Sequence, residues 1–328
     1  MIAKVFKQYS YLSVTVSALL LSLISYNYSN LTATWFSFQA KSLNFFLILA
    51  ILAITIRAID KILNARSSNG VRFWNIEITP SYHLLIYPLI VLSFPTESFD
   101  LRLLLCPALW ITGWACFLQY LENRNTISGK KSMVFLFDTV LLVSIASILF
   151  IEHLFLLPML VICLVFSTKS ITSRELGVFI LIPILLFFTT YTIFLLFDVD
   201  ALLFSPISSL KNLSFSNQPN LSFIYYNPSL LYIFFLFTCS LTLYHLPFRL
   251  KASYEIKMLN YAGLFVFGIL LTMIGFVNPL SGIELHYLSL PLTSSVYALL
   301  IFTKSQKFHN FLFISLIINV LLFTFVLN

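Results

Sequence analysis

Residues 176–197 read LGVFILIPILLFFTTYTIFLLF, and this stretch contains no charged side chain. An α-helix needs about 20 mostly apolar residues to cross the hydrocarbon core of a bilayer. A buried strand or helix of a water-soluble protein is rarely apolar over such a length. The stretch therefore predicts a transmembrane helix.

Ten further segments have the same character, and short polar breaks separate them. The predicted spans are residues 9–27, 42–60, 79–95, 101–121, 134–151, 154–168, 176–197, 229–247, 259–277, 287–303 and 310–327. The segments 79–95 and 154–168 could fail to cross fully, because Pro88 interrupts the first and the second is short and contains Pro158. We predict an all-α, polytopic transmembrane helical bundle of about 11 spans.

The overall composition agrees with a membrane protein. Apolar residues form 59% of the chain, charged residues form only 9%, and the mean hydropathy is +0.96. Soluble domains carry about 25% charged residues. A water-soluble core could not hold this much apolar surface, whereas lipid can cover it.

The basic residues orient the bundle. With the N-terminus in the cytoplasm, 16 of the 19 Lys and Arg residues lie in cytoplasmic segments, and the exceptions are Lys41, Arg102 and Lys211. Cytoplasmic loops of membrane proteins carry such an excess of positive charge. The pattern predicts a multi-pass membrane protein with a cytoplasmic N-terminus and an external C-terminus. The net charge of +7 is then a topology signal, and we expect membrane lipids, other envelope membrane proteins and no nucleic acid as partners.

The longest external loop suggests a division of the chain. Residues 1–197 form a front part of seven spans, residues 198–228 form an extracytoplasmic loop rich in Ser, Asn and Pro, and residues 229–328 form a rear part of four spans. We expect the parts to make one integral-membrane domain.

Asp138 is the carboxylate placed best inside a predicted span. An acid within a membrane is costly and therefore suggests a functional site. The alternative is structural, since Asp138 lies about one turn inside a helix start, where the helix dipole and the nearby Lys130 and Lys131 favour a negative charge. Both interpretations are open.

The external side carries the remaining candidate catalytic groups. They are Glu152, His153, Asp198, Asp200, Glu284 and His286. Together they could line an outward cavity as a general base or proton relay, or they could simply end helices at the interface. Asp198 and Asp200 also form a D-x-D pair, which is a weak signal for a metal ion.

Other patterns favour structural roles. The four cysteines lie in predicted spans without a C-x-x-C pair, so we expect no disulfide, metal site or cofactor. His83, His245 and His309 lie near inner ends of spans, where we expect solvated or capping roles, and Arg57, Asp60 and Lys61 are expected to contact lipid headgroups. Gly113, between Trp110 and Trp114, predicts a close approach of two helices.

The segment from about residue 60 to 190 resembles a known family. The shared features are Asn64, Asn69, Tyr82, Pro95, Lys130-Lys131, Phe137-Asp138, Ala146-Ser147-Ile148-Leu149-Phe150 and Thr172-Ser173-Arg174-Glu175. This pattern is similar to an uncharacterised family of multi-spanning inner-membrane proteins from Bacteroidota-type Gram-negative bacteria. The resemblance implies location without activity and marks Asp138 and Arg174 as family positions. Some members carry a carotene-cleaving oxygenase label, which this chain argues against because its histidines are predicted on opposite sides of the membrane.

Three functions are consistent with the sequence. The leading hypothesis is an accessory or structural protein of the cell envelope, with no enzymatic activity, because the spans contain few polar groups and no catalytic motif. The first alternative is a multi-spanning transferase or polymerase for envelope glycans or lipid-linked sugars. The second is a transporter or flippase, which needs a polar cavity near mid-membrane.

Overall fold

The computed structural model is helical throughout most of the part it describes. It describes residues 6, 10–30, 33–35, 41–64, 81–94, 99–124, 129–149, 154, 156–168, 171–196, 214–215, 228–240, 277–278, 286–303 and 305–325. The helices are α2 (Tyr11–Asn30), α3 (Lys41–Asn64), α4 (His83–Leu92), α5 (Leu101–Asn123), α6 (Gly129–Leu149), α7 (Leu156–Thr168), α8 (Ser173–Leu196), α11 (Pro228–Ser240), α14 (Ser289–Phe302) and α15 (Gln306–Phe325). The all-α prediction is confirmed.

Ten of the eleven predicted spans contain one of these helices, and the span predicted at 259–277 lies outside the described residues except for Val277. Five described helical segments are long and apolar enough to cross a membrane: Tyr11–Asn30, Lys41–Asn64, Leu104–Asn123, Ser132–Leu149 and Ser173–Ile193. The two segments predicted to be the weakest spans form short helices, namely α4 with 10 residues and α7 with 13. Pro88 lies inside α4 without ending it.

Two small strand pairs join segments that are distant in the sequence. β1 (Ala33–Trp35) pairs in parallel with β2 (Phe99–Asp100), and β3 (Ser214–Phe215) pairs antiparallel with β4 (Val277–Asn278). The sequence did not predict these pairs. Each is only two or three residues long, so the helices determine the architecture.

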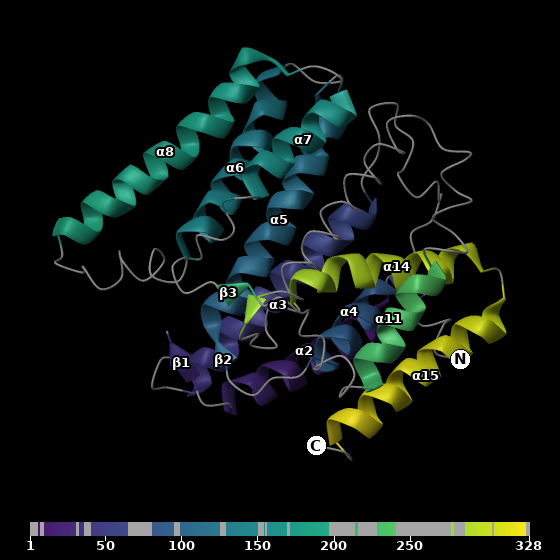
Figure 1. Ribbon diagram of the computed structural model, residues 1–328. Coiled ribbons are helices and arrows are strands. Elements are labelled where there is room, and N and C mark those ends of the chain that lie inside the picture. The colour runs from purple at the N-terminus through teal and green to yellow at the C-terminus, as the bar shows by residue number, and fades with distance from the viewer. Residues whose placement is uncertain are drawn as a thin grey trace.

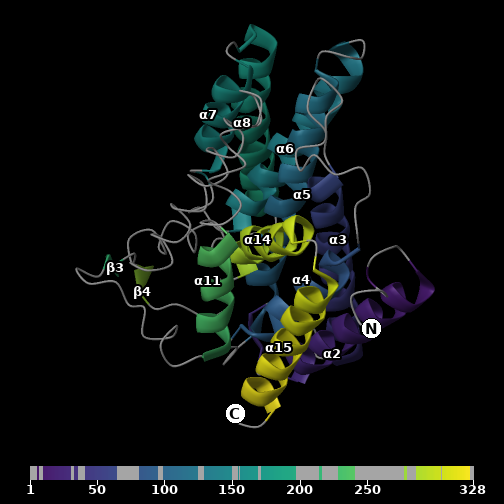
Figure 2. The same ribbon diagram turned by 90° about the vertical axis from the view of Figure 1, so that its right-hand side faces the viewer.

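The helices pack in two groups (Figures 1 and 2). α5, α6, α7 and α8 lie together at one end, and α2, α4, α11, α14 and α15 lie together at the other. α3 connects the groups, because it packs against both α5 and α2. The rear helices α14 and α15 contact α4 of the front part, so segments far apart in the chain share one core.

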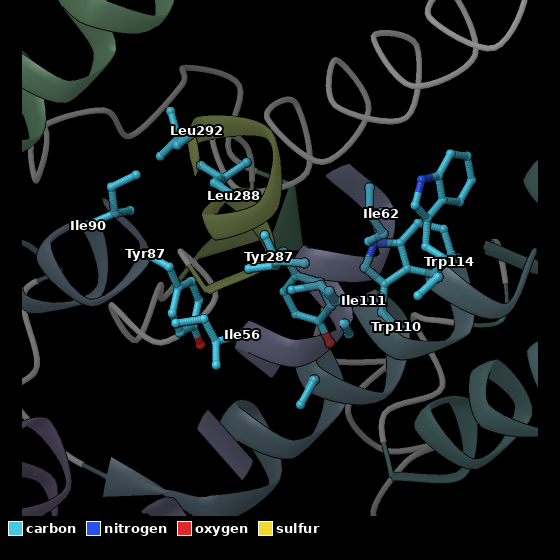
Figure 3. Packing of buried hydrophobic residues seen from close by; sticks show 14 of the residues in the cluster. Ile56, Ile62, Tyr87, Ile90, Trp110, Ile111, Trp114, Tyr287, Leu288 and Leu292 are labelled. Carbon is cyan, nitrogen blue, oxygen red and sulfur yellow. The ribbon is translucent and has the colours of Figure 1, made fainter. Parts of the chain in front are cut away.

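Figure 3 shows this core at close range. Tyr87 from α4 and Tyr287 from the turn before α14 enter it from different segments, and Trp110 and Trp114 of α5 lie beside Ile62 of α3. The two tryptophan rings are 5.5 Å apart. These aromatic side chains are buried, so packing between helices contributes much of the contact area.

α5 and α6 approach each other closely at Gly113, as predicted. A β-carbon at this position would lie 3.3 Å from Cγ2 of Val143 and 3.4 Å from the backbone oxygen of Thr139. Small residues allow such backbone proximity in membrane helix pairs. Gly113 is therefore an important packing position.

The apolar side chains on the outside of the bundle fit a lipid environment. α8 carries the clearest example, where Leu181, Leu185, Phe188 and Leu196 are all more than half exposed. Such side chains would be unfavourable in water over this area.

Candidate functional site

The structure describes two of the seven predicted site residues. Glu152, His153, Asp198, Asp200 and Glu284 lie outside the described residues, so the predicted outward cavity stays a prediction. The described candidates are Asp138 and His286, and they lie on different helices in different environments.

Asp138 lies on α6 and is partly buried. Its charge is within electrostatic range of the Cys116 thiol on α5, and so is the charge of Lys61 on α3. The described part of the chain contributes no hydrogen bond or ion pair to the Asp138 carboxylate, and the side chains of Lys130 and Lys131 lie outside that part. Both interpretations of Asp138 therefore stay open.

His286 is buried where three helix ends meet. Its Nε2 atom is 3.1 Å from the hydroxyl of Tyr28, near the end of α2. The ring of Phe94, which follows α4, packs edge-on against the imidazole with centroids 5.2 Å apart. The backbone oxygen of His286 also accepts a hydrogen bond from Ser289 at 2.6 Å. His286 thus ties α14 to α2 and α4.

Burial lowers the pKa of the His286 imidazole from its ordinary value to about 3. The folded protein therefore holds this side chain neutral, while the unfolded chain binds a proton below a pH of about 6.5. Since only the unfolded state gains that proton, stability decreases as the pH falls below about 6.5.

We expect acidification from about pH 7.5 to about pH 5 to lower the free energy of unfolding by up to about 2 kcal/mol through His286. Thermal unfolding of the detergent-solubilised protein at both pH values measures this. His286→Gln should show a smaller pH dependence, and an equal dependence in both proteins would contradict the assignment.

A second histidine is buried near the opposite ends of the helices. Nε2 of His83, at the start of α4, lies 3.4 Å from Oδ1 of Asp60, near the end of α3. The His83 side chain is 2% exposed and that of Asp60 is 31% exposed. Asn64 donates a hydrogen bond of 2.8 Å to the same carboxylate oxygen. The expectation of a solvated His83 is wrong, because helix packing covers its ring.

His309, at the start of α15, bonds to the end of α14. Nε2 lies 2.7 Å from the backbone oxygen of Thr303, which can only accept, so Nε2 carries the proton. Nδ1 can then accept from the hydroxyl of Tyr82, at 3.4 Å. Together with the Asp60–His83 pair, these contacts join α3, α4, α14 and α15.

The strongest polar cluster was missed from the sequence. Arg124, at the end of α5, forms a two-pronged contact with Glu175 of α8: Nε lies 2.8 Å from Oε1 and Nη2 lies 3.1 Å from Oε2. Glu175 also accepts from the backbone N–H of Thr172 at 2.6 Å and from the hydroxyl of Tyr120. The Thr172 hydroxyl accepts from the N–H of Glu175, so the two residues form a capping box. The T-x-x-E pattern before an apolar run is the signal that could have revealed it.

Two more polar groups lie in the core between the buried histidines. The Thr55 hydroxyl on α3 donates a hydrogen bond of 2.8 Å to the backbone oxygen of Ile51, which leaves it able to accept from the nearby hydroxyl of Tyr87 on α4. The hydroxyl of Thr293 on α14 is buried and has no hydrogen-bond partner among the described residues. Such groups are rare in protein cores and call for an explanation.

The described residues contain no cluster of His, Cys, Asp or Glu that could hold a metal ion. None of the four cysteines, all of which lie in described helices, forms a disulfide bond. Comparison with protein-family models, with curated proteins and with solved structures gives no match. Function must therefore be argued from the geometry of this chain alone.

Proposed function

We propose that this chain is a multi-pass protein of the bacterial inner membrane that acts as an accessory or structural component of the cell envelope. It crosses the membrane about 11 times, with its N-terminus in the cytoplasm and its C-terminus outside. The five membrane-length apolar helical segments support membrane residence. The basic-residue distribution supports the orientation.

The observation that carries the accessory role is how the buried polar side chains are used. The Arg124–Glu175 pair joins α5 to α8, the Tyr28–His286 pair joins α2 to α14, and the Asp60–His83 pair joins α3 to α4. Each pair connects two helices, as polar side chains in membrane bundles do. Their first role is to hold the bundle together.

The contacts also agree with the predicted orientation. Tyr28, Phe94 and His286, all expected near the external side, meet one another. Likewise, Tyr82 meets His309 on the side expected to be cytoplasmic. This arrangement supports an even number of crossings between the segments 79–95 and 287–303, as the eleven-span topology requires.

Single reporter cysteines can be labelled to find the side of the membrane on which each loop lies. They are introduced into a variant in which the four native cysteines are replaced by alanine. Ser216→Cys and Ser281→Cys should react with a membrane-impermeant maleimide added to intact spheroplasts. Ser128→Cys and Ser253→Cys should react only after the cells are opened. Labelling of Ser253→Cys and Ser281→Cys on the same side would contradict a crossing at 259–277, and gel shift of the purified protein measures each result.

The accessory role is tested with purified full-length protein in liposomes. We expect no transfer of sugar between defined lipid-linked donors and acceptors, and no movement of a labelled lipid-linked sugar between leaflets. Transfer would favour the transferase or polymerase instead, and movement would favour the flippase. An activity that persists after alanine substitution would show that the substituted carboxylates are not its catalytic groups. The positions to substitute are Asp138, Glu152, Asp198, Asp200 and Glu284.

A further inference from the structure

Three pairs of polar side chains lie one after another along the axis of α4 in the core. Each pair is called a level here. The first level holds Asp60 and His83, the second holds Thr55 and Tyr87, and the third holds Tyr28 and His286. Each pair consists of side chains from two different helices. All six side chains can donate or accept hydrogen bonds, and Asp60 and the histidines can also change charge.

The levels are ordered by the geometry of α4. His83 and Tyr87 are four residues apart, so they share one face of the helix, with their Cβ atoms about 5–6 Å apart. α2, which carries Tyr28, packs against α4, and the phenols of Tyr28 and Tyr87 are close enough for electrostatic coupling, which places the second level beside the third. From His83 to Phe94, which packs on His286, α4 and its last turn extend about 16 Å.

α14 runs alongside in the opposite direction. His286 packs on Phe94 at one end, and Tyr297 packs on His83 at the other, with ring centroids 6.2 Å apart. Thr293 lies one turn before Tyr297 on α14, between His286 and Tyr297 in the sequence. Its buried hydroxyl, without a partner in the described residues, therefore belongs to the same part of the core.

Few charges surround these groups. The sequences of α2, α4 and α14 contain no Asp, Glu, Lys or Arg. The charged residues of α3 are Lys41, Arg57, Asp60 and Lys61, and α15 contributes Lys307. Asp60 is thus the only carboxylate that these five helices supply, and its partial exposure gives the line of side chains an opening at one end.

We propose that these side chains form a proton relay, from Asp60 and His83 through Tyr87 to Tyr28 and His286. Thr55, whose hydroxyl donates to the backbone oxygen of Ile51 at 2.8 Å, positions Tyr87. A proton taken up at one end is passed on as each hydroxyl or imidazole accepts one proton and releases another. No oxidation state changes, and each hydroxyl or imidazole regains its starting orientation by rotation before the next transfer, so no co-reactant is needed. The free-energy difference in proton concentration or electrical potential across the membrane drives the transfer.

Two features of the structure suit this role. A neutral imidazole has one acceptor nitrogen and one donor nitrogen, so it can receive and release a proton at different atoms. Successive levels follow one another in the core, because His83 and Tyr87 are one turn apart on α4 and α4 packs against α2, which carries Tyr28. Chains of ionisable side chains within membrane helices serve as proton relays in pumps and transporters.

A purely structural role is the competing explanation, because the same pairs also connect helices. Removal of one hydroxyl distinguishes the two roles. Tyr87→Phe keeps the ring and its packing but deletes the atom that carries the proton. A structural role predicts a change of stability alone, whereas a relay also predicts a loss of proton flux.

The experiment uses the full-length protein in potassium-loaded liposomes that contain a pH-sensitive dye. Valinomycin sets the membrane potential, and the initial rate of internal pH change is measured. We expect flux clearly above that of protein-free liposomes, and a decrease of about tenfold or more for both Tyr87→Phe and Tyr28→Phe. Tyr232→Phe is the matched control, because it removes a hydroxyl bonded to Ser315 between α11 and α15 at 2.6 Å, and its flux should equal that of the wild type.

Variants are compared only at equal incorporation, and Tyr28→Phe alone decides the outcome if Tyr87→Phe does not insert. Wild-type flux equal to that of protein-free liposomes would overturn the proposal. Unchanged flux in both tyrosine variants, or an equal loss in Tyr232→Phe, would do the same. The proton relay goes beyond the proposed envelope role. Proton flux tests the relay, whereas the transfer and labelling experiments test the envelope role.

Discussion

Replacing Gly113 by leucine is expected to disrupt the contact between α5 and α6. A β-carbon there already lies 3.3 Å from Cγ2 of Val143 and 3.4 Å from the backbone oxygen of Thr139, and leucine adds three further carbons. Because the backbone oxygen cannot rotate away, the helices must separate. Overpacking of this kind costs about 1–3 kcal/mol, occasionally more.

The measurement is the temperature at which the detergent-solubilised protein loses its monodisperse elution peak. Gly177→Leu is the matched control, since nothing lies within 4 Å of a β-carbon built at Gly177 of α8. The same substitution there should leave that temperature unchanged or raise it, because leucine favours a helix more than glycine does. A similar loss in both variants would show that the glycine contact is not the cause.

The second large effect is expected at Arg124. Arg124→Leu removes the two-pronged partner of the Glu175 carboxylate, and the carboxylate stays buried. Breaking a buried ion pair from one side typically costs about 3–5 kcal/mol, because a charge is left without its counter-charge. The capping box of α8 depends on the same carboxylate, so the start of this helix should also loosen.

Arg174→Leu provides the control for this experiment. Arg174 is exposed and adjacent to Glu175 in sequence, and its loss should change stability by less than about 0.5 kcal/mol. The double variant Arg124→Leu/Glu175→Leu should recover part of the loss, since no unpaired charge stays buried. Equal stability of wild type and Arg124→Leu would mean that solvent, not Arg124, satisfies the carboxylate.

The helices were largely predictable because a bilayer imposes a simple length requirement on apolar segments. The predicted spans 9–27, 42–60 and 101–121, for example, correspond to α2, α3 and α5 within a few residues. The weakness of 79–95 and 154–168 was also visible, as Pro88 and the short second segment indicated. Gly113 was identifiable because small residues between large aromatic ones favour close helix contact.

The polar clusters were less predictable, because their partners lie far apart in the chain. Asp60 and His83 were assigned separately to lipid headgroups and to solvent, yet they lie 3.4 Å apart in the fold. Arg124 and Glu175 are separated by 51 residues. Tyr28 and His286 are separated by 258. Periodicity and charge counts describe local segments, and they do not specify which helices become neighbours.

The sequence alone therefore determined that the chain is helical and apolar enough for a membrane, because these properties depend on segment length and composition. It also indicated an orientation, because the basic residues alternate between segments. Only the tertiary structure decided that α4 packs between α2, α3, α14 and α15. This packing brings the polar side chains along α4 together. Helix contacts in a membrane depend on shape and on individual hydrogen bonds, and lipid-facing and helix-facing apolar residues look the same in a sequence.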